Sequence, residues 1–159
     1  MTLSAGTRVN RIASLVVFAV TILWLTVGYV VAPVLFLELP SKQAGDVAGI
    51  LFNISSLVVL VTLIMIVGVY IGLEISIKSI KSLILGLLLL FILRFWIAPW
   101  MADIKESYPQ GLLRSSPDWE LFSTLHGVYQ LIYLAVIILL LIWSFKAGFK
   151  IEKAPVNKL

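Results

Sequence analysis

Residues 83–101 read LILGLLLLFILRFWIAPWM, and this stretch decides the fold. Its nineteen residues contain a single charge, Arg94. A transmembrane helix needs about 20 predominantly apolar residues, so the stretch is long enough to cross a bilayer. An ionised side chain inside a membrane costs at least about 2.5–3.5 kcal/mol, and it normally faces protein, an anion or water rather than lipid. The central question is therefore what the Arg94 guanidinium contacts.

The composition of the whole chain is that of an integral membrane protein. Of its 159 residues, 61% are hydrophobic and 13% are charged, and the mean hydropathy is +1.10. Soluble domains average about 45–50% apolar and about 25% charged residues. The chain has room for four spans with short connections, which predicts a single transmembrane domain over residues 1–159.

Four apolar runs predict an all-α, integral membrane four-helix bundle. The helices are expected at about residues 12–37, 47–73, 82–101 and 118–145. Pro33 has no N–H to donate, so it is expected to bend or end the first helix. Trp100, Trp119 and Trp143 are expected in the aromatic belts at the two membrane surfaces.

Basic residues are distributed unevenly between the two sides of this predicted bundle. Eight lie before the first span, between the second and third, and after the fourth: Arg8, Arg11, Lys78, Lys81, Lys146, Lys150, Lys153 and Lys158. The other two connections hold three: Lys42, Lys105 and Arg114. The positive-inside rule then places both termini in the cytoplasm, and we expect a multi-pass protein of a bacterial inner membrane. Because these residues flank apolar spans, the net charge of +4 does not indicate nucleic-acid binding.

A short pattern occurs twice along the chain. Gly28 and Arg94 each lie four residues before an Ala-Pro pair, Ala32-Pro33 in the first case and Ala98-Pro99 in the second. Such a repeat suggests two tandem helical hairpins related by an axis along the membrane normal. A chance similarity between two apolar spans is the alternative.

Most polar side chains within the spans are expected at one depth, toward the outer side. At about 1.5 Å per residue, Arg94 and His126 each lie about 8–10 Å below the outer boundary. The candidate ligand-binding residues at this level are Arg94, His126, Asn53, Ser56, Tyr129 and Gln130. In the functional interpretation Arg94 anchors an anion, His126 forms a hydrogen bond or titrates, and the others orient the ligand. In the structural interpretation Asp46, Glu38 or Asp103 neutralises Arg94, and His126 joins two helices.

Other kinds of chemistry find little support in the sequence. The chain has no cysteine, which removes disulfides and thiolate metal sites. No carboxylate pair lies within the spans and no Gly-rich phosphate loop follows a strand, so we expect neither catalytic residues nor a cofactor. The spacings Gly45–Gly49 and Gly68–Gly72 permit close approach of another helix, from a membrane-protein partner or a second copy of the chain.

A further set of residues runs from about Gly28 to Ile138. It consists of Phe36, Leu39-Pro40, Gly45, Gly49, Leu51-Phe52, Arg94, Trp96, Pro99, Phe122 and His126-Gly127. This set resembles the family of four-helix membrane proteins related to human transmembrane protein 205. The resemblance implies four helices with both ends on one side, and a family whose activity is unassigned but whose human member is associated with tolerance of platinum drugs. It makes His126 a weak candidate metal ligand, although the absence of cysteine argues against a soft-metal site.

The sequence therefore predicts a small, non-enzymatic membrane protein. It would bind or transport a small or lipid-like anionic ligand in a polar layer of the outer half of the bundle. The alternative is an accessory or scaffold subunit of a larger membrane complex. A further alternative is a metal- or haem-handling protein, but a chain with one histidine cannot provide both axial ligands of a bis-histidine haem.

Overall fold

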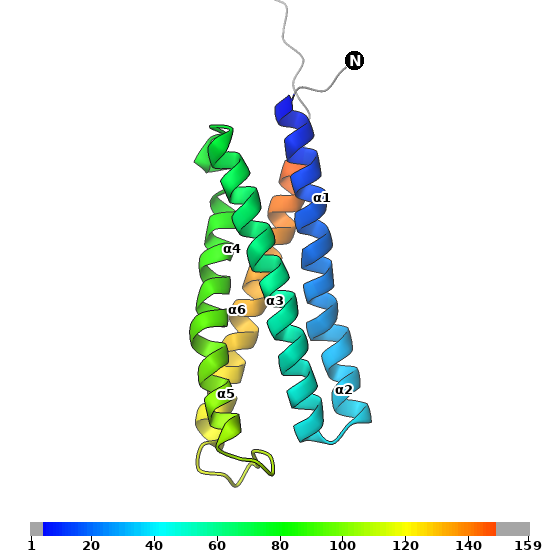
Figure 1. The fold of residues 1–159 in the computed structure, drawn as a ribbon, viewed down its shortest axis with the longest axis vertical. Coiled ribbons are helices and arrows are strands. Elements are labelled where there is room, and N and C mark those ends of the chain that lie inside the picture. The colour runs from blue at the N-terminus through cyan, green and yellow to red at the C-terminus, as the bar shows by residue number, and fades with distance from the viewer. Residues whose placement is uncertain (1–4, 149–159) are drawn as a thin grey trace, which may run out of the picture.

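The computed structural model describes residues 5–148, and that range contains helices and connections but no strand (Figure 1). In chain order the elements are α1 (Ala5–Thr26), η1 (Val27–Val31), α2 (Ala32–Glu38), α3 (Ser41–Gly72), η2 (Ile77–Ser79), α4 (Lys81–Ile92), η3 (Leu93–Ile97), α5 (Ala98–Glu106) and α6 (Trp119–Gly148). They form four continuous rods, each long and apolar enough to cross a membrane. The predicted all-α, four-span architecture is confirmed. The predicted tail lysines Lys150, Lys153 and Lys158 lie outside the described residues.

The helices extend further than the apolar runs that predicted them. The first rod begins at Ala5 rather than at residue 12, and the third continues to Glu106 rather than ending at residue 101. The second begins at Ser41, directly after Pro40, whose extended backbone sets the start of the helix. Apolar runs mark the part of a helix that lies in hydrocarbon, whereas the backbone hydrogen bonds continue into the polar flanks.

Pro33 and Pro99 lie inside continuous rods, so Pro33 does not end its helix. Each follows a five-residue π-helical turn, η1 or η3. Within these turns the backbone N–H of Ala32 donates to the Val27 carbonyl, and the N–H of Ala98 donates to the Leu93 carbonyl. A proline ring clashes with the carbonyl four residues earlier, and a wider turn relieves that clash by bonding five residues back. The Ala-Pro repeat is therefore present in the backbone as well as in the sequence.

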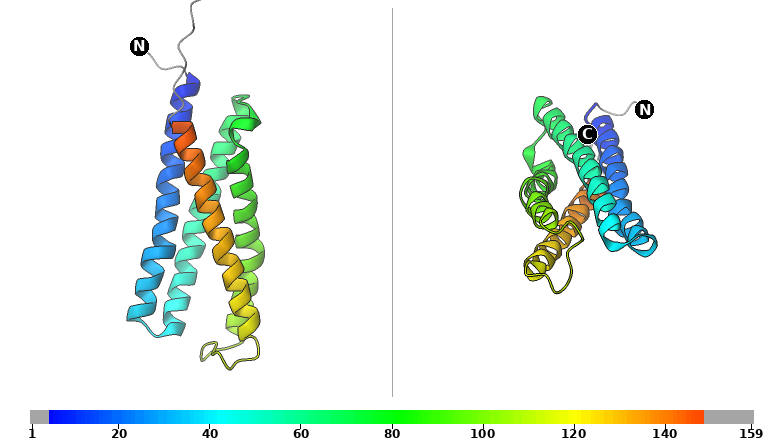
Figure 2. Two further views of the ribbon diagram at one scale, coloured as in Figure 1. Left: turned by 180° about the vertical axis from the view of Figure 1, so that it is seen from behind. Right: turned by 60° about the horizontal axis from the view of Figure 1, so that its bottom comes forward.

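The four rods form a ring in which each contacts two neighbours. The rod of α1 packs against α3 and α6, and the rod of α4 packs against the same two helices. The described chain starts and finishes at one end of the bundle, here called the terminal end, and the 107–118 connection lies at the other, here called the loop end (Figures 1 and 2). Toward the loop end α6 moves away from the first rod and approaches α5, so the two hairpins separate there (Figure 2).

Aromatic side chains fill the centre of the bundle where three rods meet. The Tyr133 ring lies 4.4 Å from that of Trp24, 5.6 Å from Phe52 and 6.3 Å from Tyr129, between ring centroids. The Tyr133 hydroxyl donates to the Trp24 backbone carbonyl. This cluster ties α6 to α1 and α3 directly beside the first π turn.

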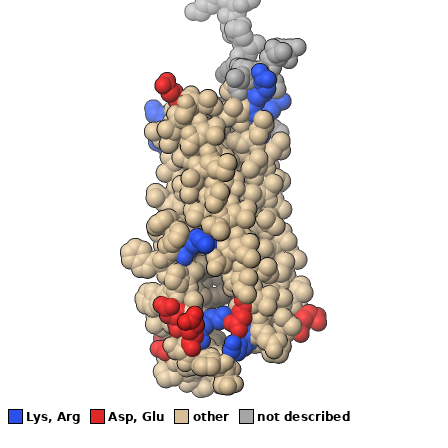
Figure 3. Space-filling view, in the orientation of Figure 1, with Lys and Arg blue, Asp and Glu red and all other residues tan. Residues whose placement is uncertain are grey.

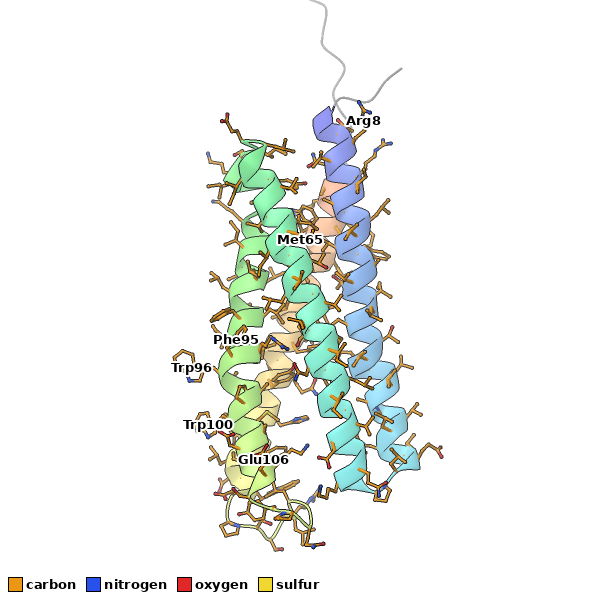
Figure 4. All side chains as sticks on the ribbon, in the orientation of Figure 1. Arg8, Met65, Phe95, Trp96, Trp100 and Glu106 are labelled. Atoms are coloured by element: carbon orange, nitrogen blue, oxygen red, sulfur yellow. The ribbon has the colours of Figure 1, made fainter. Side chains whose placement is uncertain are left out.

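Trp143 does not face outward, as a residue of an aromatic belt would. Its side chain is only 3% exposed, and its indole Nε1–H donates to the Ser79 carbonyl at 2.9 Å. Trp100 is 47% exposed and projects away from the bundle, as the prediction requires (Figure 4). An indole N–H can satisfy a loop carbonyl as well as a lipid headgroup, and sequence position does not distinguish the two.

Candidate functional site

The second π turn directs Arg94 toward α3. The Arg94 Nη1 donates to the Asn53 side-chain oxygen at 2.6 Å, to the Asn53 backbone carbonyl at 2.8 Å and to the Ser56 Oγ at 3.0 Å. The structure therefore brings together three of the six predicted site residues, one on the third rod and two on the second. We call these three residues the Arg94 layer.

The acceptors on α3 are arranged by the helix itself. The Ser56 hydroxyl donates to the Asn53 carbonyl at 3.0 Å while its oxygen accepts from Arg94. Because a hydroxyl has one proton and two lone pairs, it can fill both roles. Serine and asparagine three residues apart share one helix face, which is why a single guanidinium nitrogen reaches both.

No carboxylate neutralises Arg94 within the part of the chain that the structure describes. The two ion pairs in that part are Asp46–Lys42 at 2.9 Å and Asp46–Lys105 at 3.1 Å. The structural interpretation, in which Asp46, Glu38 or Asp103 neutralises Arg94, is therefore wrong. Asp46 is engaged at the loop end, and Arg94 is surrounded by neutral oxygens.

The remaining donors of Arg94 are unused among residues 5–148. All three hydrogen bonds come from Nη1, so the Nε and Nη2 edge has no acceptor in that range. This edge is the one that binds a carboxylate or phosphate through two parallel hydrogen bonds. The side chain is partly buried, and its Cζ lies 5.8 Å from the centroid of the exposed Phe95 ring.

Tyr129 is one of the three predicted site residues on α6. It interacts electrostatically with Arg94 and packs against Phe52 with ring centroids 6.1 Å apart. The exposed His126 ring stacks on Phe122 at 6.2 Å, and Gln130 is partly buried. Neither of the last two forms a hydrogen bond with the Arg94 layer, so the structure does not bring these two predicted residues into that contact network.

A second cation crosses between the hairpins nearer the loop end. The Lys105 Nζ of α5 donates to the Gly45 carbonyl of α3 at 3.1 Å and pairs with Asp46. A pocket of about 340 Å³ lies beside this bridge. Figure 3 shows an isolated basic patch at mid-height, a hollow below it, and a cluster of charged groups at the loop end.

Sequence reasoning missed the role of Lys105 by placing it in a loop. The third rod continues to Glu106, so Lys105 follows Arg94 by three helical turns and lies on the same face. That eleven-residue spacing was a usable signal. It was obscured by the end of the apolar run at Met101.

Among the described residues, no group of three or more His, Cys, Asp or Glu side chains is placed to hold a metal ion. His126 is the single histidine, and its ring contacts an aromatic neighbour. The site presents guanidinium N–H donors and neutral hydrogen-bonding groups, and guanidinium donors are the kind that oxyanions pair with. It contains no pair of groups arranged to transfer a proton within the described range.

Comparison with known proteins gives one match. Residues 23–110 match a family described as a domain of unknown function, DUF4149. The matched region runs from the end of α1 into the 107–118 connection, and it includes both π turns and all of the Arg94 layer. No curated protein and no solved structure matches this chain. Because the match covers more than half of the sequence, the chain belongs to the DUF4149 family.

Proposed function

We propose that this protein binds an anionic ligand at Arg94. The observation that carries the proposal is the unused Nε and Nη2 edge of a guanidinium fixed within a membrane span. Leaving N–H donors without acceptors inside a membrane costs free energy, and a carboxylate or phosphate would satisfy them and neutralise the charge together. The Asn53 and Ser56 acceptors hold the guanidinium in place and leave that edge available.

The surroundings of Arg94 favour a ligand with apolar character. Phe95 lies against the guanidinium, and Phe91 packs on Phe95 with ring centroids 4.5 Å apart. Both phenylalanines are more than half exposed, so they face hydrocarbon in a membrane. The acyl chain of a lipid-like acid already lies in hydrocarbon, so contact with these phenylalanines requires no dehydration. Its polar end can then form hydrogen bonds with Tyr129, Gln130 and His126 of α6.

The orientation and the wider relationship of the protein are part of this proposal. With the basic terminal end in the cytoplasm, the Arg94 layer lies in the outer half of a bacterial inner membrane. The motif residues also relate the chain to the proteins grouped with human transmembrane protein 205. Two of those motifs, at Phe122 and His126-Gly127, lie beyond the matched family region. We propose a binding protein that performs no chemistry on its ligand.

Native mass spectrometry of the protein in mild detergent tests this function. Oleate is the probe, and oleyl alcohol is the same chain without the carboxylate. The wild-type protein is expected to retain oleate and not the alcohol. Arg94→Leu should lose oleate because no other described cation lies in the layer, and Arg94→Lys should retain it weakly because an ammonium lacks the planar edge.

Arg114→Leu is the matched control, because it removes one arginine from the loop connection. Its Cζ lies 5.9 Å from the Trp119 ring, outside the spans. Oleate binding should be unchanged in this variant. Equal retention of oleate by the wild type and Arg94→Leu, with both proteins folded by circular dichroism, would contradict the proposal.

One observation favours the alternative of an accessory or scaffold subunit. Gly68 and Gly72 are exposed on α3, and an added Cβ at either position would meet no atom within 4 Å. Their GxxxG spacing is therefore not used inside the bundle and leaves room for another helix. Gly68→Leu should release a stoichiometric partner or second copy seen after gentle extraction. An unchanged complex would remove the support that these glycines give to this alternative.

A further inference from the structure

A second candidate binding site lies at the terminal end of the bundle, away from the Arg94 layer. A groove of about 330 Å³ runs between α1 and α6. Its lining combines one cation, Arg11, with mainly apolar surface and two serines. The groove goes beyond the function proposed above, because it shares no residue with the Arg94 layer.

Small side chains create the groove. Ser14 of α1 and Ser144 of α6 are each 5% exposed, and both line it. The Ser14 hydroxyl donates to the Arg11 carbonyl at 2.8 Å, and the Ser144 hydroxyl donates to the Leu140 carbonyl at 2.8 Å. Because both hydroxyls are satisfied within their own helices, the lining does not require a polar ligand along its length.

The walls of the groove are apolar and open to the outside of the bundle. Leu15 is 68% exposed, and the rings of Phe18 and Phe145 meet edge to face with centroids 5.9 Å apart. In a membrane these side chains contact acyl chains. A hydrocarbon chain lying between α1 and α6 would contact both helices at once.

The charge at the terminal end is positive around this groove. Arg11 is exposed, and within residues 5–148 its guanidinium has no ion-pair partner. Arg8 lies one turn earlier on α1, at the terminal end (Figure 4). The described carboxylate at this end is Glu74, in the connection that follows α3, and Figure 3 shows an acidic group well apart from the larger basic patch.

We propose that this groove binds an anionic phospholipid of the surrounding membrane. Its phosphate binds the Arg11 guanidinium, and an acyl chain lies along Leu15, Phe18 and Phe145. Basic pockets between transmembrane helices recognise lipid headgroups in this way, because the cation meets the phosphate where the apolar walls meet the chain. A zwitterionic lipid gains less binding affinity from Arg11 because it has no net charge. A soluble phosphate gains none from the apolar walls because it has no acyl chain.

The test uses the full-length chain carrying Arg94→Leu, so that the Arg94 layer cannot contribute and the two proposals can fail separately. The delipidated protein in mild detergent is titrated with phosphatidylglycerol, phosphatidylcholine or glycerol phosphate, and native mass spectrometry counts the bound molecules. Phosphatidylglycerol is expected to bind more tightly than phosphatidylcholine, and glycerol phosphate is expected not to bind. Arg11→Gln should weaken phosphatidylglycerol binding about fivefold.

Arg8→Gln is the matched control, since it removes the same charge from a residue that does not line the groove. It should change the affinity much less than Arg11→Gln does. Ser144→Leu fills the groove and keeps every charge, so it should also weaken binding. If that variant does not fold, Leu15→Ala removes an exposed apolar side chain from the wall of the groove and should also weaken binding.

Four outcomes would overturn the proposal. Equal losses in Arg8→Gln and Arg11→Gln would mean diffuse attraction to the protein surface. Equal binding of phosphatidylcholine would mean that the groove does not recognise the anionic charge. Binding of glycerol phosphate as tight as that of the lipid would mean that it does not recognise the acyl chain. Absence of a bound phosphatidylglycerol in the parent protein would mean that the groove does not bind this lipid.

Discussion

In the first hairpin the second residue of the π turn is Gly28, and in the second hairpin the corresponding residue is Arg94. Both turns precede Ala-Pro, and both face a neighbouring rod. At Gly28 the neighbour is α6, and the Tyr133 side chain comes so close that a Cβ on Gly28 would lie 2.5 Å from its hydroxyl oxygen. At Arg94 the neighbour is α3, and the side chain itself crosses the gap to Asn53 and Ser56.

The difference shows that one backbone device can either close a helix contact or place a charge. The Ala-Pro pair determines the wide turn, because the proline has no N–H and its ring excludes the usual carbonyl position. The residue four positions before the alanine, Gly28 or Arg94, determines how the turn contacts the neighbouring helix. With no side chain at that position the partner tyrosine packs against the helix, and with an arginine the helices are joined by hydrogen bonds.

The largest expected effect that tests the comparison between the two π turns is at Gly28. Gly28→Ala should lower the free energy of unfolding by about 1–3 kcal/mol, because the added methyl overpacks the contact with Tyr133. Tyr133 is fully buried against Trp24 and Phe52, so it has little room to move. Unfolding by SDS in mixed micelles, followed by circular dichroism, measures the change.

Gly127→Ala on α6 is the control for this substitution. An added Cβ there meets no atom within 4 Å, so the usual preference of a helix for alanine should stabilise the protein by about 0.5–1 kcal/mol. Opposite signs for the two variants support the packing argument. A gain in stability for Gly28→Ala as well would show that the first turn does not depend on close approach.

Arg94 and Lys105 of the second hairpin each bridge to α3, and the Lys105 bridge extends the comparison to the loop end. Lys105 and Lys42 both pair with Asp46, but Lys105 alone reaches it from the other hairpin. Lys105→Met should therefore lengthen and broaden the distance between spin labels at Gln43→Cys and Ser123→Cys, and Lys42→Met should not. The chain has no native cysteine, so the labels attach only at these positions.

The stability change is expected to be small, about 0.2–1 kcal/mol, because water reaches the partly exposed Lys105–Asp46 pair and screens it. Electron–electron resonance in nanodiscs gives the distance distributions directly. Identical distributions for the two methionine variants would mean that helix packing alone sets the separation of the hairpins.

The sequence predicted the spans and one part of the site for the same physical reason. Bilayer thickness fixes the length of an apolar run, and helical rise then converts residue number into depth. Arg94, Asn53 and Ser56 were expected at one level, and the structure joins them by hydrogen bonds. The repeated Ala-Pro pair likewise pointed to two corresponding helices, and both carry the wide turn.

The rotation of each helix about its axis could not be predicted in the same way. By helical spacing, Phe122, His126, Tyr129 and Tyr133 share one face of α6, which favours that face pointing inward. Tyr133 is buried, but His126 is exposed. His126 and Gln130 were expected near the depth of Arg94, but neither forms a hydrogen bond with the Arg94 layer. Trp143 turned inward to a loop carbonyl, and Lys105 remained helical, because packing and hydrogen bonds beyond the apolar runs decide such details.

The two hairpins also differ in their connections, and this difference gives a measurement of pH dependence. Leu39 and Pro40 alone separate α2 from α3, whereas residues 107–118 join α5 to α6. The longer connection is closed by the Tyr108 hydroxyl, which donates to the Asp118 Oδ2 at 2.8 Å. The hydrogen bond to this carboxylate, together with partial burial, raises the pKa of Tyr108.

Because the pKa is raised in the folded protein, the contact contributes fully below the unfolded value of about 10 and is lost as the pH rises through the folded value. Asp118→Asn should return the pKa of Tyr108 toward its usual range. Asparagine is as well suited as aspartate to the position before the first residue of α6, so the helix should keep its N-terminus. The tyrosinate absorbance of each protein, minus that of its Tyr108→Phe counterpart, isolates this titration. An unchanged midpoint in Asp118→Asn would mean that the carboxylate does not hold the connection closed, and that other contacts give the longer loop its shape.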